Sequence, residues 1–340
     1  MTAQEETGAW RNEIISVVGG SGFIGRHVVA ALARAGYRVR VICRRPDLAI
    51  HLLPLGVPGQ IALIQANVRM PESLKTAVEG SVAVLNLVGI LAERGDQTFE
   101  AVHVKGAAAV ARAAKEAGVR TFVHISALGA DSASPSAYGR TKWWGEQAVR
   151  AEYEEAVILR PSVVVGPEDE FFNKFAAMAR FSPALPLIGG GRTRFQPVYV
   201  ADIAHAIEKL VGDAALKRGQ TLELGGPEVF SFRELMEFML AVIRRRKWLV
   251  NVPFGLMQAL AWPAQFLPRP PITPDQVRML RRHSVVSAQA KKEGRTFAGL
   301  GIEPEGIEAV VPPYLERYRP AGQFTVVRES LAEMLRLRAG

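Results

Sequence analysis

Apolar and polar positions alternate in two ways along the first half of the chain. Short runs of aliphatic residues, typical of strands buried on both faces of a parallel sheet, alternate with segments whose apolar residues recur with the period of a helix. Because strand and helix alternate with short links, the pattern predicts an α/β fold with a doubly wound parallel sheet. The strands are expected at 14–18, 37–42, 61–66, 82–88, 121–126 and 156–159. The helices are expected from about 23 to 36, 73 to 79, 99 to 117 and 136 to 151.

The second half has a different pattern, with frequent prolines and irregularly spaced helices after Gly166. Ser231 and Glu234 have the spacing of a capping box, and Thr273 followed by Pro274 predicts another helix start. This part is expected to form a smaller, mostly helical domain over the carboxyl edge of the sheet, where α/β proteins bind their ligands. The expected divisions are a flexible N-terminus at 1–12, a nucleotide-binding domain at 13–166 with its sheet completed by parts of 190–225, a substrate or partner domain at 167–320 and a tail at 321–340.

A glycine-rich loop follows the first predicted strand, with Gly19, Gly22 and Gly25 in the spacing G-x-x-G-x-x-G. The first glycine permits a sharp turn, the second lets the backbone approach a pyrophosphate, and the third lets the next helix pack on the sheet. The N-terminus of that helix directs N–H groups and the positive end of its dipole at the anion. A flexible turn is the alternative, but the flanking strand and helix favour a Rossmann-type dinucleotide site, and Arg26 sets a P-loop aside. The nucleotide contacts expected in this loop are Gly19, Ser21, Gly22, Phe23, Ile24 and Gly25.

The end of the second strand indicates which dinucleotide binds. An NAD site usually places Asp or Glu about 20 residues beyond the glycines, where the carboxylate accepts a hydrogen bond from the ribose 2′-hydroxyl. This chain has Arg44 and Arg45 there. Because a guanidinium can bind a phosphate with two parallel hydrogen bonds, the pair favours NADP(H) over NAD(H). Further nucleotide contacts are expected where other strands end, at Asn67, Val68, Leu87, Val88, Gly89 and Pro161.

Three residues form a candidate catalytic group. Tyr138 and Lys142 are four residues apart on a predicted helix, hence on one face, and Ser126 ends the strand before it. The ammonium is expected to stabilise the phenolate and lower the pKa of Tyr138. The tyrosine could then exchange a proton with a substrate hydroxyl, with Ser126 holding the substrate oxygen and Lys142 bonding the nicotinamide ribose, so that Tyr138 and Lys142 also count as cofactor contacts. Such a pair on an arbitrary helix is usually only solvated, so turnover stays open.

Composition narrows the class of protein. Of the 340 residues, 49% are hydrophobic, which suffices for a sizeable core. Cys43 is the single cysteine, so an intramolecular disulfide framework is excluded and a small buried side chain is expected. The six histidines are scattered, and no metal site is expected. The polar start of the chain carries Glu5 and Glu6 and resembles neither a signal peptide nor a transit peptide, so a cytoplasmic, bacterial protein is expected.

The net charge of +9 predicts attraction to an acidic surface. Nucleic acid is the least favoured surface, because no recognised binding motif accompanies the charge. A basic cluster precedes an apolar stretch at 252–267, which Pro263 interrupts and which is too short for the roughly 20 apolar residues of a spanning helix. This region could contact an anionic membrane, peripherally on the cytoplasmic face of the inner membrane, or an amphipathic partner. The basic cluster consists of Arg244, Arg245, Arg246, Lys247 and Trp248.

The basic cluster and the apolar stretch also have a purely structural explanation. The cations could simply stabilise the C-terminus of the helix that begins after Ser231, with the apolar stretch packed on the domain core. A further segment, 327–337, could form a short amphipathic helix of open role.

The motifs together resemble the short-chain dehydrogenase/reductase superfamily, in its extended and atypical branches. The resemblance covers roughly the first 210 residues. Two departures stand out. The superfamily commonly has Asp at the third strand end, where this chain has Asn67, whose amide can still bond the adenine but without charge. Trp143 and Trp144 are bulkier than usual and could fill part of a substrate pocket or serve as core or interface anchors. The motifs are GGSGFIG at 19–25, NLVG at 86–89, Ser126, YGRTK at 138–142 and LRPSVVVGP at 159–167.

Four segments carry a more specific resemblance. They are HISALGAD at 124–131, LRPSVVVGPEDEFFNKF at 159–175, FQPVYVADIAHAI at 195–207 and PPITPDQVRML at 270–280. With these segments the chain resembles, within the superfamily, the nucleotide-binding accessory subunits of respiratory complex I and their bacterial relatives. That resemblance implies a tightly bound NADPH with a mainly structural role and a place beside the junction of the peripheral and membrane arms.

Three functions therefore remain open at the level of sequence. The first is an NADP(H)-binding accessory or assembly subunit of a membrane respiratory complex. The second is a soluble NADPH-dependent reductase, dehydrogenase or epimerase. The third is an accessory protein of ubiquinone biosynthesis, with which relatives of this branch look associated.

Overall fold

The computed structural model describes residues 12–267, 270, 272–320 and 322. Most of the expected N-terminal segment, nearly all of the C-terminal tail and the segment 327–337 lie outside these residues. Contacts divide the chain into two units. Unit 1 runs from the first described residue to Ser162 and includes Val200–Gly225 and Val286–Glu303. Unit 2 consists of Val163–Tyr199, Gly226–Val285 and the described residues from Pro304 on.

Unit 1 is built on one parallel sheet of seven strands in the order β11-β6-β5-β4-β1-β2-β3. The expected Rossmann-type, doubly wound fold is confirmed, and the order reverses beside β1, where such sheets bind nucleotides. The strands are β1 (Ile14–Val18), β2 (Arg38–Cys43), β3 (Ile61–Gln65), β4 (Ala83–Asn86), β5 (Thr121–Ile125), β6 (Val157–Pro161) and β11 (Thr221–Leu224).

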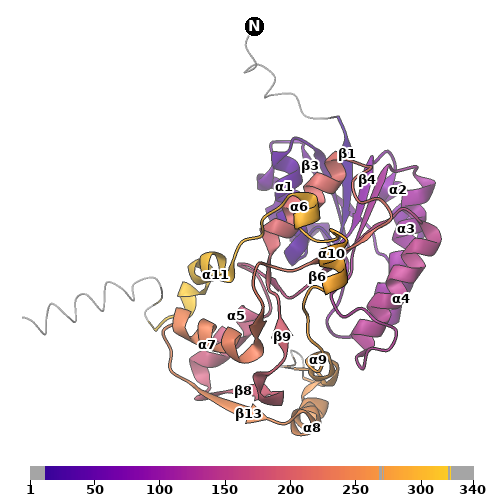
Figure 1. The fold of residues 1–340 in the computed structure, drawn as a ribbon. Coiled ribbons are helices and arrows are strands. Elements are labelled where there is room, and N and C mark those ends of the chain that lie inside the picture. Colours follow the sequence, from indigo (N-terminus) through magenta and orange to yellow (C-terminus); the bar gives the residue numbers. More distant parts are fainter. Residues whose placement is uncertain (1–11, 268–269, 271, 321, 323–340) are drawn as a thin grey trace, which may run out of the picture. The chain divides into compact units, whose positions relative to one another are not determined.

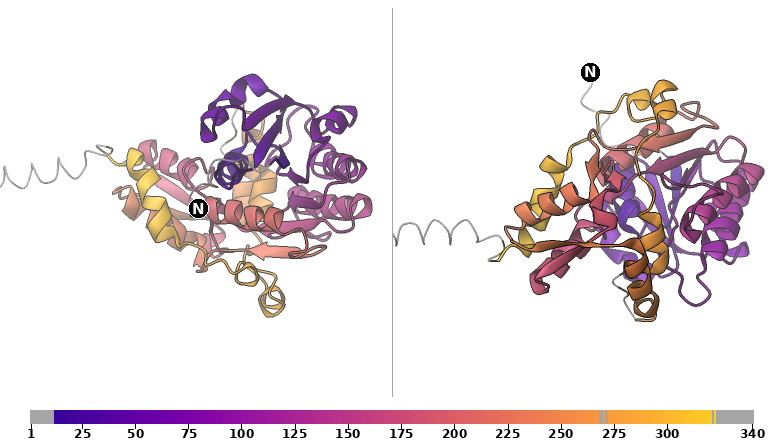
Figure 2. Two further views of the ribbon diagram at one scale, coloured as in Figure 1. Left: turned by 90° about the horizontal axis from the view of Figure 1, so that it is seen from above. Right: turned by 60° about the horizontal axis from the view of Figure 1, so that its bottom comes forward.

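Helices cover both faces of this sheet (Figures 1 and 2). Helix α1 packs beside α6 on one face, while α2, α3 and α4 pack in a row on the other. The second layer encloses a fully buried core that includes Leu74, Val110 and Phe122. The helices are α1 (Phe23–Arg34), α2 (Glu72–Val78), α3 (Ala107–Glu116), α4 (Ala137–Glu152), α6 (Val200–Gly212) and α10 (Ala288–Lys292), with the 3₁₀ segments η1 (Pro46–Leu55) and η4 (Ala298–Leu300).

One helix differs from its expected form. The segment expected as a single helix from 99 to 117 begins as a π-helix, η2 (Glu100–Gly106), and only then continues as α3. A π turn is wider than an α turn and is often found at functional sites. A Cβ atom at Gly106 would lie 2.9 Å from Cγ2 of Val68, so this wide turn is packed tightly against the segment that follows β3. The periodicity of the sequence does not distinguish the two helix types.

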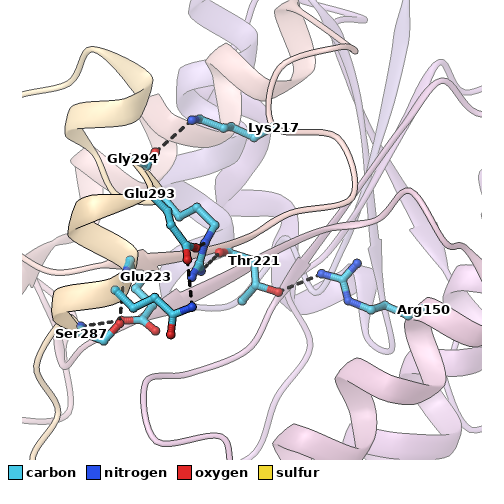
Figure 3. Close-up of polar contacts among 10 residues, drawn as sticks. Arg150, Lys217, Thr221, Glu223, Ser287, Glu293 and Gly294 are labelled. Atoms are coloured by element: carbon cyan, nitrogen blue, oxygen red, sulfur yellow. Dashed lines mark hydrogen bonds and ion pairs between the residues drawn. The ribbon is translucent and has the colours of Figure 1, made fainter.

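The open edge of the sheet at β11 is closed by the returning segment Val286–Glu303 (Figure 3). The backbone N–H of Glu223 donates to the Arg295 carbonyl at 2.9 Å, and Nη1 of Arg295 donates to the Thr221 carbonyl at 2.8 Å. The Glu223 carboxylate also accepts from the Ser287 N–H at 2.7 Å. Capping an edge strand in this way removes a template for aggregation. The sequence pattern had placed this segment within the smaller domain at 167–320.

Unit 2 combines helices with two-stranded sheets around an aromatic core, including Phe172 and Phe232. The capping boxes at Ser231 and Thr273 are present, each with reciprocal bonds to the residue three positions on. The strands are β7 (Val164–Val165), β8 (Ala184–Ile188), β9 (Arg194–Phe195), β10 (Val198–Tyr199), β12 (Phe230–Ser231) and β13 (Trp248–Val252). The helices are α5 (Phe172–Phe181), α7 (Phe232–Val242), α8 (Phe254–Ala264), α9 (Pro274–Met279) and α11 (Ile307–Leu315), with the 3₁₀ segments η3 (Gly189–Gly191) and η5 (Glu316–Tyr318).

Candidate functional site

The glycine loop has the backbone geometry that an approaching pyrophosphate requires. Gly19 has a φ of +83°, a conformation that favours glycine, and its N–H donates to the Ile42 carbonyl at 2.9 Å. A Cβ atom at Gly25 would lie 2.5 Å from the Gly19 carbonyl oxygen, so helix and loop are in backbone contact. Helix α1 begins at Phe23 without a side-chain cap and without an acidic residue in its first turn. Its N-terminus is therefore suited to an anion.

The end of β4 lies beside this loop, as expected. Strand β4 pairs with β1, with Asn86 opposite Val18, and a Cβ atom at Gly19 would lie 3.0 Å from Cγ2 of Val88. Asn86 Oδ1 accepts from the Val88 N–H at 3.2 Å, which holds the start of the NLVG element in place. A Cβ atom at Gly89 would lie 3.3 Å from the Lys142 ammonium. The NLVG element thus connects the glycine loop with the candidate catalytic helix.

The two arginines after β2 are both exposed but have different partners. Arg44 Nη1 donates to the side-chain oxygen of Gln97, which is neutral. Arg45 forms an ion pair with Asp47 at 2.7 Å, and this bond lowers the pKa of Asp47. The contact with Gln97 therefore leaves the positive charge of Arg44 uncompensated, whereas the carboxylate of Asp47 compensates the charge of Arg45. Arg44 is the better candidate for a 2′-phosphate.

The remaining predicted nucleotide contacts lie at or just after the ends of neighbouring strands. Asn67 follows β3, and its Oδ1 accepts from the Arg69 N–H at 3.1 Å. Val68 is buried, and Leu87 is half-buried. Pro161 ends β6, is buried, and accepts from the Leu128 N–H at 2.9 Å.

The structure brings the three candidate catalytic residues together. Lys142 is buried and donates to the Ile125 carbonyl at 3.0 Å, directly before Ser126. Its Nζ lies 5.9 Å from the centre of the Tyr138 ring. The hydroxyl of Ser126 is buried and has no hydrogen-bond partner among the described atoms. Because an unsatisfied buried hydroxyl is costly, this atom suits a bound ligand oxygen.

The expected lowering of the pKa of Tyr138 is wrong for this structure. Burial raises that pKa to about 12, because the tyrosine packs against the rings of Phe99 and His103 at centroid distances of 6.0 and 5.4 Å. Burial also lowers the pKa of Lys142 to about 8, although Glu146 opposes this shift. The ammonium is directed at the Ile125 carbonyl, and desolvation outweighs its effect on the phenol.

Two buried histidines belong to the site and were not predicted from the sequence. His103 Nε2 accepts a hydrogen bond from the Ile90 N–H at 3.1 Å, so the ring proton is on Nδ1. This Nδ1–H donates to Thr141 Oγ1, with 3.1 Å between the nitrogen and the oxygen. His124 Nδ1 lies 3.1 Å from the amide nitrogen of Asn86, which must be the donor. The other nitrogen of His124 is buried without a partner.

The pKa values of both histidines lie far below the usual range. Burial, followed by the charge of Lys142, lowers the pKa of His103 to about 2 and that of His124 to about 3. Both rings are therefore neutral at physiological pH. Asn86 and His124 stand opposite each other in the register of β4 and β5, so their pairing could have been found from adjacent predicted strands. The position of His103 could not have been found in this way, because it lies in a π-helical segment that the sequence pattern does not predict.

We expect these histidines to make the protein acid-sensitive. Below pH about 6.5 the unfolded chain binds protons that the native histidines do not, so the stability present above that pH is lost as pH falls, by about 1 kcal/mol per pH unit for each histidine. Urea unfolding between pH 7 and pH 4 measures this slope. His103→Gln should lower stability at pH 7 but flatten the slope, whereas the matched change in the exposed His51 should leave it unaltered. Parallel slopes for His103→Gln and the parent protein would contradict the assignment.

The tryptophans that follow Lys142 are not buried in the core. Trp144 is 51% exposed, and its ring meets that of Trp143 edge-on at 4.6 Å. Both stand on α4, within the layer formed with α3. The expectation of a core anchor therefore does not hold for Trp144.

Comparison with known proteins agrees with this geometry. The model of the NAD dependent epimerase/dehydratase family matches residues 15–225, which include all of the parallel sheet except the first residue of β1. The chain belongs to this family. Members of this family bind a nicotinamide dinucleotide, and the glycine loop of this chain has the backbone geometry that such a nucleotide requires.

Relatives of two kinds are similar to this member of the family. It is 36% identical over 320 residues to subunit 9 of the alpha subcomplex of mitochondrial NADH dehydrogenase (ubiquinone) 1 from Arabidopsis thaliana, covering 91% of this chain and 79% of that protein. It is 35% identical over 192 residues to ceramide reductase from Caulobacter vibrioides, covering 56% of this chain and 58% of that protein. Among solved structures, a dTDP-glucose 4,6-dehydratase from Streptomyces venezuelae with bound NAD has the same fold, with a TM-score of 0.67, 20% identity and coverage of 90% of this chain and 96% of that one.

Proposed function

We propose that the protein is an NADP(H)-binding accessory or assembly subunit of a complex I-like respiratory complex, in which the nucleotide has a mainly structural role. The observation that carries this proposal is the extent of the similarity to the plant subunit. That similarity covers 91% of the chain and so includes much of unit 2, whereas the similarity to ceramide reductase covers 56%. If the protein binds its partners through both units, similarity to a subunit of such a complex is expected to extend over the sequences of both.

The local electrostatics support a structural role for the nucleotide. The pKa of Tyr138 is about 12, so the phenol does not readily give up its proton near neutral pH. Its neighbour Lys142 is buried and bonded to the Ile125 carbonyl. NADP(H), with its 2′-phosphate at Arg44, is the form of the cofactor that we propose.

The protein would act peripherally, on the cytoplasmic face of the inner membrane. Among the described residues, no helix has the length and apolar character that crossing a bilayer requires. The basic cluster of Arg244, Arg245, Arg246, Lys247 and Trp248 is proposed as part of the attachment to that membrane.

Affinity purification from native membranes tests the proposal. A tagged protein is expected to bring down complex I subunits after gentle solubilisation. Mass analysis of the nucleotide released on denaturation should find NADPH that no added carbonyl substrate oxidises. The proposal is lost if no complex I subunit is recovered and the protein stays wholly in the low-salt supernatant.

A soluble reductase is the second candidate function, favoured by the unpartnered hydroxyl of Ser126 next to Lys142. In that case Tyr138→Phe should lower turnover by a factor on the order of 100 or more while NADPH affinity changes little, because the phenol hydroxyl would transfer a proton in the reaction. Steady-state assays and NADPH titration measure the two effects. Unchanged turnover in Tyr138→Phe would count decisively against this mechanism.

A further inference from the structure

Helix α8 is apolar around its circumference, yet it packs against the rest of unit 2 on one side only. Met257 and Ala261 are buried against Val277 of α9 and Ile188 of β8. A helix that is apolar all round is normally buried in a large core or in lipid. The α8 apolar face is the name that we give to five exposed side chains, namely Leu256, Leu260 and Trp262 on the helix and Phe266 and Leu267 just beyond its end.

The α8 apolar face is unusually exposed. The side chains of Trp262 and Phe266 are 63% and 74% exposed, and their rings meet edge-on at 5.8 Å. Leu256 and Leu260 are four residues apart and thus neighbours on the helix surface. Contiguous apolar patches of this kind mark interaction sites in soluble proteins.

Cations lie on the N-terminal side of the α8 apolar face, before β13 and beside the first residue of α8. Figure 1 shows β13 leading into α8, and a strand of this length spans about 16 Å, with Lys247 at its start. None of the ion pairs in the described part of the chain involves Arg246 or Lys247. The exposed Arg281 has its guanidinium 5.4 Å from the ring centre of Phe254, where α8 begins. Between residues 244 and 267 the sequence contains no acidic residue.

Strand β13 adds a further aromatic side chain. Trp248 is 76% exposed and follows Lys247 directly. It pairs with Ala184 of β8 through its backbone, so its side chain is not needed to hold the strand. Tryptophan beside cations is typical of the interface between lipid headgroups and water.

We propose that the α8 apolar face lies in the headgroup region of an anionic bilayer, parallel to the membrane plane, with Arg246, Lys247 and Arg281 contacting lipid phosphates. Such helices enter about 5–10 Å into the interface. A bilayer fits better than a second copy of this chain, because two faces flanked by cations repel each other. The inference rests on the proposed membrane-side location, but its test needs only purified protein and protein-free vesicles, so either can fail without the other.

Vesicle flotation tests the inference. The full chain is expected to float with phosphatidylcholine vesicles containing about one-third phosphatidylglycerol, and to bind pure phosphatidylcholine on the order of 100-fold less, because three cations each lose about 1 kcal/mol of attraction. Leu260→Ser with Phe266→Ser should weaken binding by about 10-fold or more, because apolar area is lost from the interface. Arg246→Gln with Lys247→Gln should weaken it by about 20-fold and reduce its salt dependence.

Matched controls separate these effects from general changes in apolar surface or charge. Leu48 and Ile50 in η1 are 67% and 59% exposed, so Leu48→Ser with Ile50→Ser should leave vesicle binding unchanged. Lys291→Gln with Lys292→Gln, on the exposed end of α10, also removes two positive charges, but from unit 1. This pair should change vesicle binding by less than twofold.

Circular dichroism of each variant shows that it is folded. The inference is overturned if the parent protein does not float, if anionic lipid makes no difference, or if the control pairs weaken binding as much as the pairs in unit 2. It is also overturned if the protein is a dimer that Leu260→Ser with Phe266→Ser dissociates, since the face would then belong to a second copy.

Discussion

Gly25→Ala is expected to weaken nucleotide binding by about 100-fold and to destabilise the protein. The added Cβ would lie 2.5 Å from the Gly19 carbonyl oxygen and 2.6 Å from Cα of Gly20. Both are backbone atoms, so no side chain can rotate away, and such overpacking costs about 1–3 kcal/mol. Moving the loop away from the N-terminus of α1 should also cost the anion two charge-assisted hydrogen bonds, or about 100-fold in affinity. Thermal unfolding without nucleotide and NADPH titration measure the two losses.

Gly22→Ala separates binding from stability at the same loop. Gly22 is exposed, has a φ of −77°, and a Cβ atom there would contact only the Gly19 carbonyl oxygen, at 3.3 Å. The unliganded protein should therefore unfold within roughly 2 °C of the parent, while NADPH affinity falls about 10-fold. Gly255→Ala, where nothing lies within 4 Å of the new atom, should change neither. Normal NADPH affinity in Gly22→Ala would show that the pyrophosphate does not lie against this loop.

Arg44→Asp is expected to reverse the cofactor preference. The change replaces a guanidinium that can bind a 2′-phosphate with a carboxylate that repels it, and hydrogen bonds to charged groups are worth about 1.5–3 kcal/mol each. NADPH affinity should therefore fall by about 100-fold, whereas NADH affinity should stay within a few-fold, because a carboxylate can accept from the 2′-hydroxyl. The dissociation constants of both nucleotides measure the effect.

Arg38→Asp is the matched control for this experiment. Arg38 is exposed at the amino end of the same strand, β2. Its replacement by Asp changes the net charge by the same amount, but at the end of the strand opposite to Arg44. It should alter NADPH affinity less than twofold at physiological ionic strength. Arg45→Asp should have a smaller effect than Arg44→Asp, because Arg45 is already paired with Asp47. Equal losses of NADPH and NADH in Arg44→Asp would refute the 2′-phosphate assignment.

Local features of the chain were predicted well because neighbouring residues determine them. Strand β1 has the expected bounds, α1 begins at the expected Phe23, and Gly36, which follows it, has a φ of +84°. The predicted capping box at Ser231 depends on residues three positions apart, and the helix start at Thr273 depends on the adjacent Pro274. In each case the decisive contacts are made within one turn or one strand, and the sequence pattern contains them.

Other features depend on residues that are distant in sequence and were not predicted. Strand β13 pairs with β8 across about sixty residues, in a part of the chain for which the sequence pattern predicted no strand. His103 meets Ile90 and Thr141 only because η2, the NLVG element and α4 converge in the fold. No local pattern encodes such pairings.

The sequence alone determined the Rossmann-type unit, the glycine loop and the presence of arginines where a nucleotide ribose is expected, since these follow from spacing along one strand, turn and helix. Only the tertiary structure decided that Arg44 meets a neutral side chain, how the sheet edge is closed, and in which direction the pKa of Tyr138 moves. Those properties depend on partners from remote segments: Gln97 for Arg44, Arg295 for β11, and the buried rings around Tyr138. Burial is a property of the whole fold, and here it outweighs the local charge of Lys142.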